Sequence, residues 1–253
     1  MMQKKLHVFS VLNSLAGGDL CKRDLFDESF SFSMPEMIVS GEFKRVLSEI
    51  KKAELFQSIT EPNIDVLRYL EASEFSFVEV RLPKDDGFLN CAFLFEFSNS
   101  RIKKVKAFYL SSRSLSMSEE SVDIESLNWP KDVRLFMEAF MSGEWGRVAE
   151  MFAKDGRIKT SYQESINVHD SRNEKFFNQL LASPHPQIFK VLEGDQFCLA
   201  EAYWGAHKTL FFWERTESQK FESWEFFGKS GLSLRSKSAR QSNSETQNFR
   251  PSL

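Results

Sequence analysis

The chain has 253 residues, a formal net charge of −3 and a hydrophobic fraction of 42%, values that are ordinary for a soluble globular protein of one large domain or two small ones. They exclude a collagen-like chain, a mostly disordered chain and a disulfide-dense secreted scaffold. Phenylalanine occurs 26 times and tyrosine only 4 times, so the chain has ample apolar bulk for packed cores or apolar cavities.

The N-terminal segment predicts a helix. Two lysines precede a moderately apolar run that ends at Cys21, which superficially resembles an export signal. However, Leu20 is too large for the small residue that signal cleavage requires. Large apolar residues recur at helical spacing, at Leu6, Phe9, Leu12 and Leu15. We therefore expect an amphipathic helix of the mature protein, and no stretch approaches the ~20 apolar residues of a membrane span.

The cysteines and the charges argue against several kinds of site. Cys21, Cys91 and Cys198 are scattered and none belongs to a CxxC pair, so we expect reduced thiols in a cytoplasmic protein without a metal site or a cofactor. Residues 229–253 carry five basic side chains and one acidic one, which leaves the rest of the chain more acidic than its net charge. An acidic body disfavours contact with a phosphate backbone. We expect neither a nucleic-acid partner nor a membrane partner.

The strongest pattern is an internal repeat. The segment Glu74–Leu82 (EFSFVEVRL) aligns with Gln196–Trp204 (QFCLAEAYW), so that Glu201 follows Glu79 by 122 positions. Further matches keep the same order at similar offsets: Phe9 with Leu135, Gly18 with Gly143, Pro62 with Pro184, Glu71 with Glu193, and Ile102 with Phe221. Small changes of offset are what loop insertions would produce between two copies of one fold.

The segments outside the repeat set the expected domain boundaries. Residues 111–128 contain seven serines and four acids and end before Trp129-Pro130, which is typical of a flexible connector. The tail after Gly228 has too few large apolar residues to offset its ordering entropy. We therefore predict a first domain over 1–112, a linker over 113–128, a second domain over 129–228 and a disordered basic tail over 229–253. A tail that binds acidic partners is the alternative.

Each copy predicts a helix, a short helix, a strand, a second long helix and then several strands. In the second copy we expect three helices. One begins at Pro130, a second begins at Trp145, and the third spans Asn173–Leu181. The expected strands are Arg157–Tyr162, Ile188–Leu192, Phe197–Trp204, Leu210–Arg215 and Phe221–Phe227. Because the last strands are consecutive, the sheet should be mainly antiparallel and the fold class α+β.

Two stretches carry a family resemblance. Leu135–Ile158, with its Ser-Gly-Glu-Trp and Met-Phe-Ala-Lys-Asp-Gly segments, resembles the opening of the nuclear transport factor 2-like superfamily. Leu94–Ile102 and Val105–Tyr109 resemble its closing hairpin. This superfamily includes SnoaL-like polyketide cyclases and ketosteroid isomerases. The resemblance covers about 1–110 and 130–228 and implies two cone-shaped α+β barrel domains. Each would be a curved, mainly antiparallel sheet wrapped by about three helices, with a mouth that admits a small apolar molecule.

The resemblance also implies positions for a proton-transfer site, and this chain departs from the pattern at each of them. The expected positions of the family's two acids hold Met34 and Phe93 in the first copy, and Thr160 and Phe211 in the second. The position of the family's phenol holds Val11 and Phe136. None of these side chains can act as a base or donate as a phenol does, so the isomerase constellation is missing from both copies.

The remaining catalytic candidates are Glu79 and Glu201, at matching places on matching strands. A carboxylate on a half-buried strand would have a raised pKa that suits general acid–base catalysis; the alternative is a structural role, facing outward or paired with a neighbour such as Arg81. Alternation does not say which face of the strand lines the cone. The ligand-pocket candidates from the two copies are Phe77, Arg81, Tyr109, Leu199, Tyr203 and Trp224.

The four histidines, His7, His169, His185 and His207, have no metal-ligand spacing, and we expect them to be exposed. His169-Asp170 has the composition of a catalytic dyad, but adjacent residues point in different directions. The aromatic strands around Trp213 and Trp224 fit a core or an interface better than a stacking platform for nucleic acid, because interleaved bases are lacking.

These patterns lead to two expectations about function. Single-copy relatives commonly pair through the outer surface of the sheet, so two copies on one chain could pair intramolecularly as a pseudo-dimer. The leading interpretation is a non-catalytic protein that binds a small hydrophobic ligand or acts as a scaffold. The alternative is a SnoaL-like isomerase, cyclase or dehydratase that acts on a small hydrophobic carbonyl compound by general acid–base catalysis, with Glu79 or Glu201 as the base.

Overall fold

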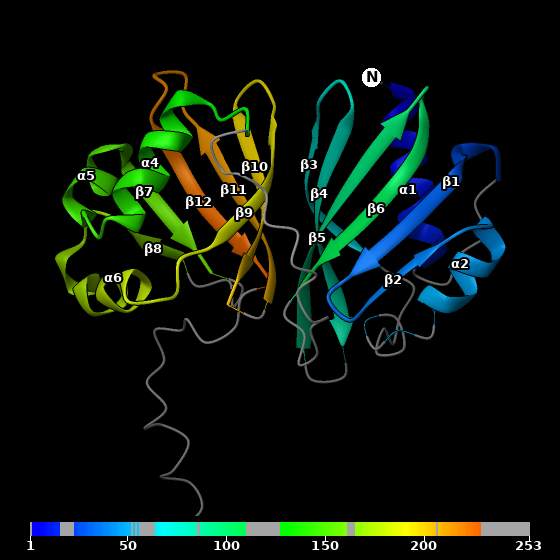
Figure 1. Ribbon diagram of the computed structural model, residues 1–253, viewed down its shortest axis with the longest axis horizontal. Coiled ribbons are helices and arrows are strands. Elements are labelled where there is room, and N and C mark those ends of the chain that lie inside the picture. The colour runs from blue at the N-terminus through cyan, green and yellow to red at the C-terminus, as the bar shows by residue number, and fades with distance from the viewer. Residues whose placement is uncertain are drawn as a thin grey trace, which may run out of the picture.

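The computed structural model describes residues 2–15, 23–51, 53, 55, 64–84, 87–109, 127–160, 165–205 and 207–228. Its helices and strands form two groups, each built on one six-stranded sheet (Figure 1). The expected tail, most of the expected linker, Cys21 and Pro62 lie outside the described residues.

Among the described residues, the helices and strands of the first group whose bounds are defined are two helices, a 3-10 turn and six strands. In chain order they are α1 (Met2–Leu15), η1 (Arg23–Leu25), β1 (Phe26–Met34), β2 (Met37–Ser40), α2 (Phe43–Ile50), β3 (Asp65–Glu71), β4 (Phe75–Lys84), β5 (Gly87–Ser98) and β6 (Arg101–Phe108). The strand order in the sheet is β2-β1-β6-β5-β4-β3, and every pair is antiparallel except β1 with β6.

The second group repeats this plan. It comprises α4 (Lys131–Met141), α5 (Trp145–Glu150), β7 (Phe152–Lys159), β8 (Ser165–Asn167), η3 (Ser171–Asn173), α6 (Glu174–Leu181), β9 (Gln187–Glu193), β10 (Phe197–Trp204), β11 (His207–Arg215) and β12 (Phe221–Phe227). The order is β8-β7-β12-β11-β10-β9, and only β7 and β12 are parallel. The expected α+β class and mainly antiparallel sheets are confirmed.

Strand registers confirm the repeat residue by residue. Phe75 pairs with Glu96 in the first sheet, and Phe197 pairs with Glu214 in the second. Both parallel pairs also carry a register shift at the same place, after Phe26 in β1 and after Phe152 in β7. The chain therefore contains two copies of one topology, which is what the aligned segments predicted.

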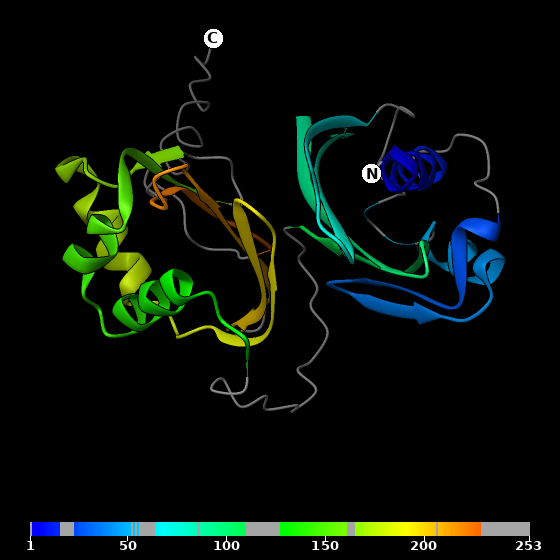
Figure 2. The same cartoon turned by 90° about the horizontal axis from the view of Figure 1, so that it is seen from above.

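The expected curved sheets are confirmed, and both are open. The two edge strands of each sheet, β2 and β3 in the first and β8 and β9 in the second, do not pair with each other. The curvature is visible in Figure 2, where α1 lies in the concave side of the first sheet and α4, α5 and α6 cover one side of the second. The helices lie on the outer flanks of the molecule, and the helix-free faces of the two sheets face each other (Figures 1 and 2).

The first helix is present, but its buried face differs from the expected one. Leu6 is 63% exposed, whereas Val8, Val11, Leu12 and Leu15 are buried. These four residues follow the i, i+3, i+4, i+7 spacing, so the two valines shift the apolar stripe away from Leu6. In the part of the chain that the structure describes, no helix has both the length and the apolar character to cross a lipid bilayer.

Two cores fill the concave sides of the sheets. The first contains the buried residues of α1 and α2 together with one side of β1, β4, β5 and β6. The second is dominated by aromatic side chains from α4, α6, β10, β11 and β12. A third apolar cluster lies between the sheets and draws residues from both of them.

Candidate functional site

The residues proposed from the sequence as a site divide between two faces of the sheets. Alternate side chains of β4 point to opposite faces; Val78, Val80 and Leu82 belong to the first core, so Phe77, Glu79 and Arg81 lie on the outer face. In β10 the same alternation places Leu199, Glu201 and Tyr203 on the outer face, away from Cys198, Ala200 and Ala202 of the second core. Of the candidates, only Tyr109 and Trp224 lie in the cores.

Aromatic rings form the centre of the contact between the two outer faces, which we call the outer-face contact. Phe77 stacks on Phe212 with ring centroids 5.1 Å apart, and Phe75 meets Phe197 edge-on at 5.9 Å. The buried members of this cluster are Phe75, Phe77, Ala92, Leu94, Phe108, Phe197, Leu199, Leu210, Phe212 and Phe227. Offset and edge-to-face aromatic pairs of this kind add to the free energy of burial.

A charged group that we call the Glu79 cluster flanks this centre on one side. The guanidinium of Arg68 on β3 donates to Glu225 Oε1 of the second sheet at 2.9 Å and lies 3.5 Å from Glu79 Oε2 and 3.9 Å from Glu214 Oε2. Lys159 Nζ donates to the same Glu225 oxygen at 2.6 Å. Three carboxylates thus share two cations in this cluster.

Burial changes the chemistry of the Glu79 cluster. The side chain of Glu225 is 3% exposed, and Arg68 lies over the ring of Phe212 at 4.6 Å. Loss of solvent raises the pKa of Glu79; the negative charge of Glu225 adds to this effect, and the cations Arg68 and Lys159 do not cancel it. A carboxyl group in this setting binds a proton more readily than one in water.

The Glu201 cluster flanks the other side. Lys106 Nζ of the first sheet donates to Glu201 Oε1 of the second at 2.6 Å and lies 2.8 Å from Glu96 Oε1. Lys190 Nζ donates to the same oxygen of Glu96 at 2.7 Å. Burial alone would raise the pKa of Glu96, but Lys106 and Lys190 outweigh it and lower that pKa to about 2. Two carboxylates here share two cations.

The two clusters occupy equivalent places in the repeat. Glu79 pairs with Arg68, and Glu201 with Lys190, in matching registers of β4 with β3 and β10 with β9. The equivalent positions are Glu79 and Glu201, Arg68 and Lys190, Glu214 and Glu96, Glu225 and Lys106, and Lys159 and Ser33. At the fourth pair a carboxylate replaces an ammonium group, and this replacement accounts for the third carboxylate of the Glu79 cluster.

The first cone is lined mainly by aliphatic and phenylalanine side chains. The family positions Val11, Met34 and Phe93 are all buried in its core. Its polar feature is a contact at the end of β6, where the Tyr109 hydroxyl donates to Glu36 Oε1 in the turn between β1 and β2. The second oxygen of Glu36 is buried and has no donor among the described residues.

The second cone is packed with rings. Trp224 lies parallel to Trp213, with centroids 6.2 Å apart, and meets Phe136 edge-on at 4.9 Å. Trp204, Trp213 and Trp224 are among the largest side chains that are fully buried. The family positions in this copy, Phe136 and Phe211, belong to the same core, and Thr160 is buried at the end of β7. Aromatic side chains thus fill the concave side of the second sheet.

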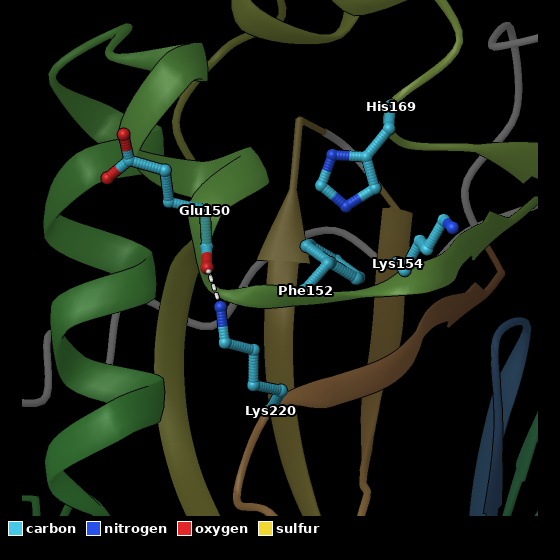
Figure 3. Close-up of a pocket in the computed structure, with 5 residues that line it drawn as sticks. All are labelled: Glu150, Phe152, Lys154, His169 and Lys220. Carbon is cyan, nitrogen blue, oxygen red and sulfur yellow. Dashed lines mark hydrogen bonds between the residues drawn. The ribbon is translucent and has the colours of Figure 1, made fainter.

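A hollow of about 630 Å³ lies on the surface of the second domain beside β7 (Figure 3). Phe152 lines it together with Glu150, Lys154, His169 and Lys220, and Lys220 Nζ donates to the carbonyl oxygen of Glu150 at 2.8 Å. Its charged side chains are exposed, so they are solvated and not preorganised for a ligand. A smaller hollow of about 270 Å³ lies between α4 and β9 and is lined mostly by Trp129, Met137, Met141, Pro186 and Ile188.

The histidines form no catalytic or metal group in the described part of the chain. His169 and His185 are exposed as expected, whereas His7 and His207 are half-buried. His169 Nε2 lies 3.0 Å from the carbonyl oxygen of Ala153, while Asp170 binds Arg172, so this pair does not act as a dyad. Among the described residues, no three His, Cys, Asp or Glu side chains are placed to hold a metal ion.

Five charged residues of the outer-face contact were not among the sequence candidates: Arg68, Lys106, Lys159, Lys190 and Glu225. A signal for two of them exists in the repeat alignment, because the offset of the last strands places Glu225 against Lys106. An opposite charge at an equivalent buried position indicates that the two copies meet different partners.

No family model and no curated protein matches the sequence. The solved structures that are similar to part of the chain include the following three. A de novo designed protein with a curved β-sheet has 13% identity and a TM-score of 0.36, over 42% of this chain and 84% of its own. An NTF-2 like protein of unknown function from Burkholderia xenovorans LB400 has 12% identity and a TM-score of 0.36, over 47% and 89%.

The third is a hypothetical protein with a ketosteroid isomerase-like fold from Catenulispora acidiphila DSM 44928, solved in complex with trimethylamine. It has 11% identity and a TM-score of 0.34, over 43% of this chain and 88% of its own. Each match spans less than half of this chain, and identities this low carry no information about activity. The chain itself contains two six-stranded sheets.

Proposed function

We propose that this protein is a non-catalytic scaffold of two nuclear transport factor 2-like domains that pair with each other as an intramolecular pseudo-dimer. The observation that carries this proposal is the occupation of the second cone by Trp204, Trp213 and Trp224, all fully buried. A cone that holds its own aromatic side chains stabilises the fold and leaves little room for a substrate. The outer-face contact supports the pairing, because apolar rings and buried ion pairs both cross it.

Each step of the pairing has a physical reason. The apolar centre removes phenylalanine rings of both sheets from water, which is favourable. Two of the flanking carboxylates, Glu201 and Glu225, are almost fully buried, and a buried charge is tolerated only with an opposite charge close by. Glu201 is 1% exposed and has its partner, Lys106, on the other sheet. Separation of the domains would leave both groups of this pair without each other.

The test of this proposal is the mass and content of the purified full chain. Light scattering after size exclusion should give the mass of a monomer, because the outer faces that could pair between chains already contact each other. Native mass spectrometry should find no co-purified small molecule in stoichiometric amount. A stable dimer would contradict the self-paired arrangement, and a bound apolar molecule would favour a ligand-binding function through the small hollow between α4 and β9.

One observation favours the enzyme alternative. The Tyr109–Glu36 pair in the first cone combines a phenol with a carboxylate of which one oxygen is buried and lacks a donor among the described residues. Such a pair could abstract a proton next to a carbonyl group. Deuterium incorporation into small apolar ketones, followed by NMR in D₂O, separates the candidates: loss with Glu36→Gln alone assigns Glu36, loss with Glu79→Gln or Glu201→Gln assigns the original candidates, and no exchange in the wild type supports the scaffold.

A further inference from the structure

The Glu79 cluster holds one more negative charge than its cations balance. Around Glu79, the groups from every packed element are Arg68 of β3, Glu214 of β11, Glu225 of β12 and Lys159 of β7. In the equivalent Glu201 cluster, two carboxylates contact the two ammonium groups of Lys106 and Lys190, and the ammonium group of Lys208 on β11 also interacts with both carboxylates. The contrast comes from the same fold position, so it reflects the charge of the residues and not a difference in architecture.

An unbalanced carboxylate at a buried contact has two ways to avoid its cost. It can gain water, which is limited in the paired state because the side chain of Glu79 is 12% exposed and increases when the faces separate, or it can bind a proton. Arg68 cannot relieve the imbalance, because its nearest oxygen, at 2.9 Å, belongs to Glu225, which also takes the ammonium group of Lys159 at 2.6 Å. Ser223 adds hydrogen bonds to Glu225 and Glu214 at 3.1 and 3.3 Å, so Glu79 keeps only a 3.5 Å contact with Arg68.

We propose that the Glu79 cluster is a proton-operated switch on domain pairing: a proton bound there tightens the outer-face contact, and its release loosens it. The inference rests on the proposed pseudo-dimer. It assigns regulation to one side of the contact, while the ion pairs of the Glu201 cluster hold the two sheets together on the other side.

The direction of the pH dependence follows from the pKa of Glu79, which burial and Glu225 raise above the ordinary value of 4.5. Above pH 4.5 the paired state then binds more protons than the separated state, so pairing becomes less favourable as pH rises. The opposite limb comes from Glu96, whose pKa of about 2 makes its contribution full above pH 4.5 and lost as pH falls towards 2. Pairing should therefore be tightest in mildly acidic solution.

The test measures the ratio of separated to paired molecules in the full chain by single-molecule fluorescence energy transfer. Dyes are attached to Ile38→Cys and Leu135→Cys, which are exposed positions of the two domains, in a Cys21→Ser background; Cys91 and Cys198 are buried thiols. The ratio is taken at several pH values from 4.5 to 8 over a urea series, and tryptophan fluorescence reports whether the second domain remains folded.

For the wild type, the ratio should rise with pH, by at most tenfold per pH unit, the limit for release of one proton. Glu79→Gln should remove this dependence and lower the ratio at pH 8. The matched control is Glu201→Gln at the equivalent position, which should raise the ratio at least tenfold at every pH, because Lys106 loses its partner across the contact. Glu214→Gln, at a less buried member of the cluster, should also flatten the pH dependence.

The outcomes separate the switch from the pairing itself. A wild-type chain that is separated at every pH contradicts the proposed pseudo-dimer. A paired chain whose ratio does not change with pH, or in which Glu79→Gln and Glu201→Gln loosen the contact equally, leaves the pseudo-dimer standing and overturns the switch. Separation that occurs only together with unfolding of the second domain, at all pH values, overturns it as well.

Discussion

Glu79 and Glu201 show how much of a residue's role depends on what lies opposite it. The sequence placed them at matching positions, and the registers confirm that match. Their side chains lie on the outer faces, where each contacts a cation: Arg68 for Glu79 and Lys106 for Glu201. Their role as general bases stays a prediction, one that the structure does not support, because both side chains lie at the outer-face contact and not in a cone.

The sequence could not decide which face of β4 lines the cone, and the reason is physical. The alternation of polar and apolar residues shows which face of a strand is buried only when the other face is exposed to solvent. Here both sides of β4 are buried, with Phe75 and Phe77 on one and Val78 and Val80 on the other. The face therefore depends on contacts from the other domain, which no local pattern encodes.

At the same scale, we predict that Trp224→Ala is strongly destabilising. The side chain is fully buried among aromatic rings of the second cone, and removal of such a ring costs about 3–5 kcal/mol of unfolding free energy. Urea denaturation followed by circular dichroism measures the change. Trp145→Ala is the control. Trp145 of α5 is half-buried against Phe177 of α6, so its removal should lower the unfolding free energy clearly less. Equal effects would mean that the second cone is loosely packed.

At the scale of elements, predictions were most accurate where strands are long and apolar. The expected strands Phe197–Trp204 and Phe221–Phe227 have the bounds of β10 and β12. The three-residue strand β8 was missed, because Ser165 and Asn167 have no strand pattern. His207 was expected in a turn and begins β11. These errors arise where pairing with a neighbouring strand, rather than side-chain preference, determines the backbone.

The start of β7 was also predicted too late. The strand was expected to begin at Arg157, whereas β7 begins at Phe152. The register shift between Phe152 and Arg157 provides the reason, because an irregular strand interrupts the alternation that marks a strand. The same shift in β1 shows that the irregularity belongs to the fold and not to one sequence.

At this scale we predict that Gly228, directly after β12, does not tolerate a side chain. Its φ of 95° is unfavourable for other residues, and an added Cβ would lie 2.4 Å from the carbonyl oxygen of Lys208. Gly228→Ala should therefore lower the unfolding free energy by more than the roughly 1–2 kcal/mol that a left-handed conformation alone costs.

Gly143→Ala is the matched control for this experiment. Gly143 also has a positive φ, of 74°, but an added Cβ would meet nothing within 4 Å. Its substitution should cost only the conformational part, and thermal denaturation of both variants measures the difference. Similar losses in the two variants would show that the carbonyl of Lys208 can move aside.

At the scale of the whole molecule, the repeat was readable from the sequence, whereas the pairing of its halves was only a hypothesis from the excess of aromatic residues. The charges that cross between the sheets could not be predicted, because Arg68 and Glu225 are 157 positions apart. Contacts of this kind depend on how the two folded sheets pack against each other. The repeat offsets show which positions are equivalent, but not which positions meet.

We predict that Phe77→Asp separates the two domains without unfolding them. The substitution puts a charge against the buried rings of Phe212 and Phe227 in the centre of the outer-face contact, where it would be removed from water. Small-angle X-ray scattering should show an extended molecule, and the exposed apolar faces should make the chain self-associate. Leu67→Asp, at an exposed position of β3 in the same sheet, is the control and should leave the scattering curve unchanged.

The unlike charges at Lys106 and Glu225 also restrict how such a gene can evolve. If recombination copied the second repeat over the first, both flanks of the contact would carry three carboxylates; if it copied the first over the second, neither flank would. The duplicated halves have therefore ceased to be interchangeable. Selection on one repeat now acts on a surface whose complement is encoded in the other, so substitutions at these positions should be inherited as pairs.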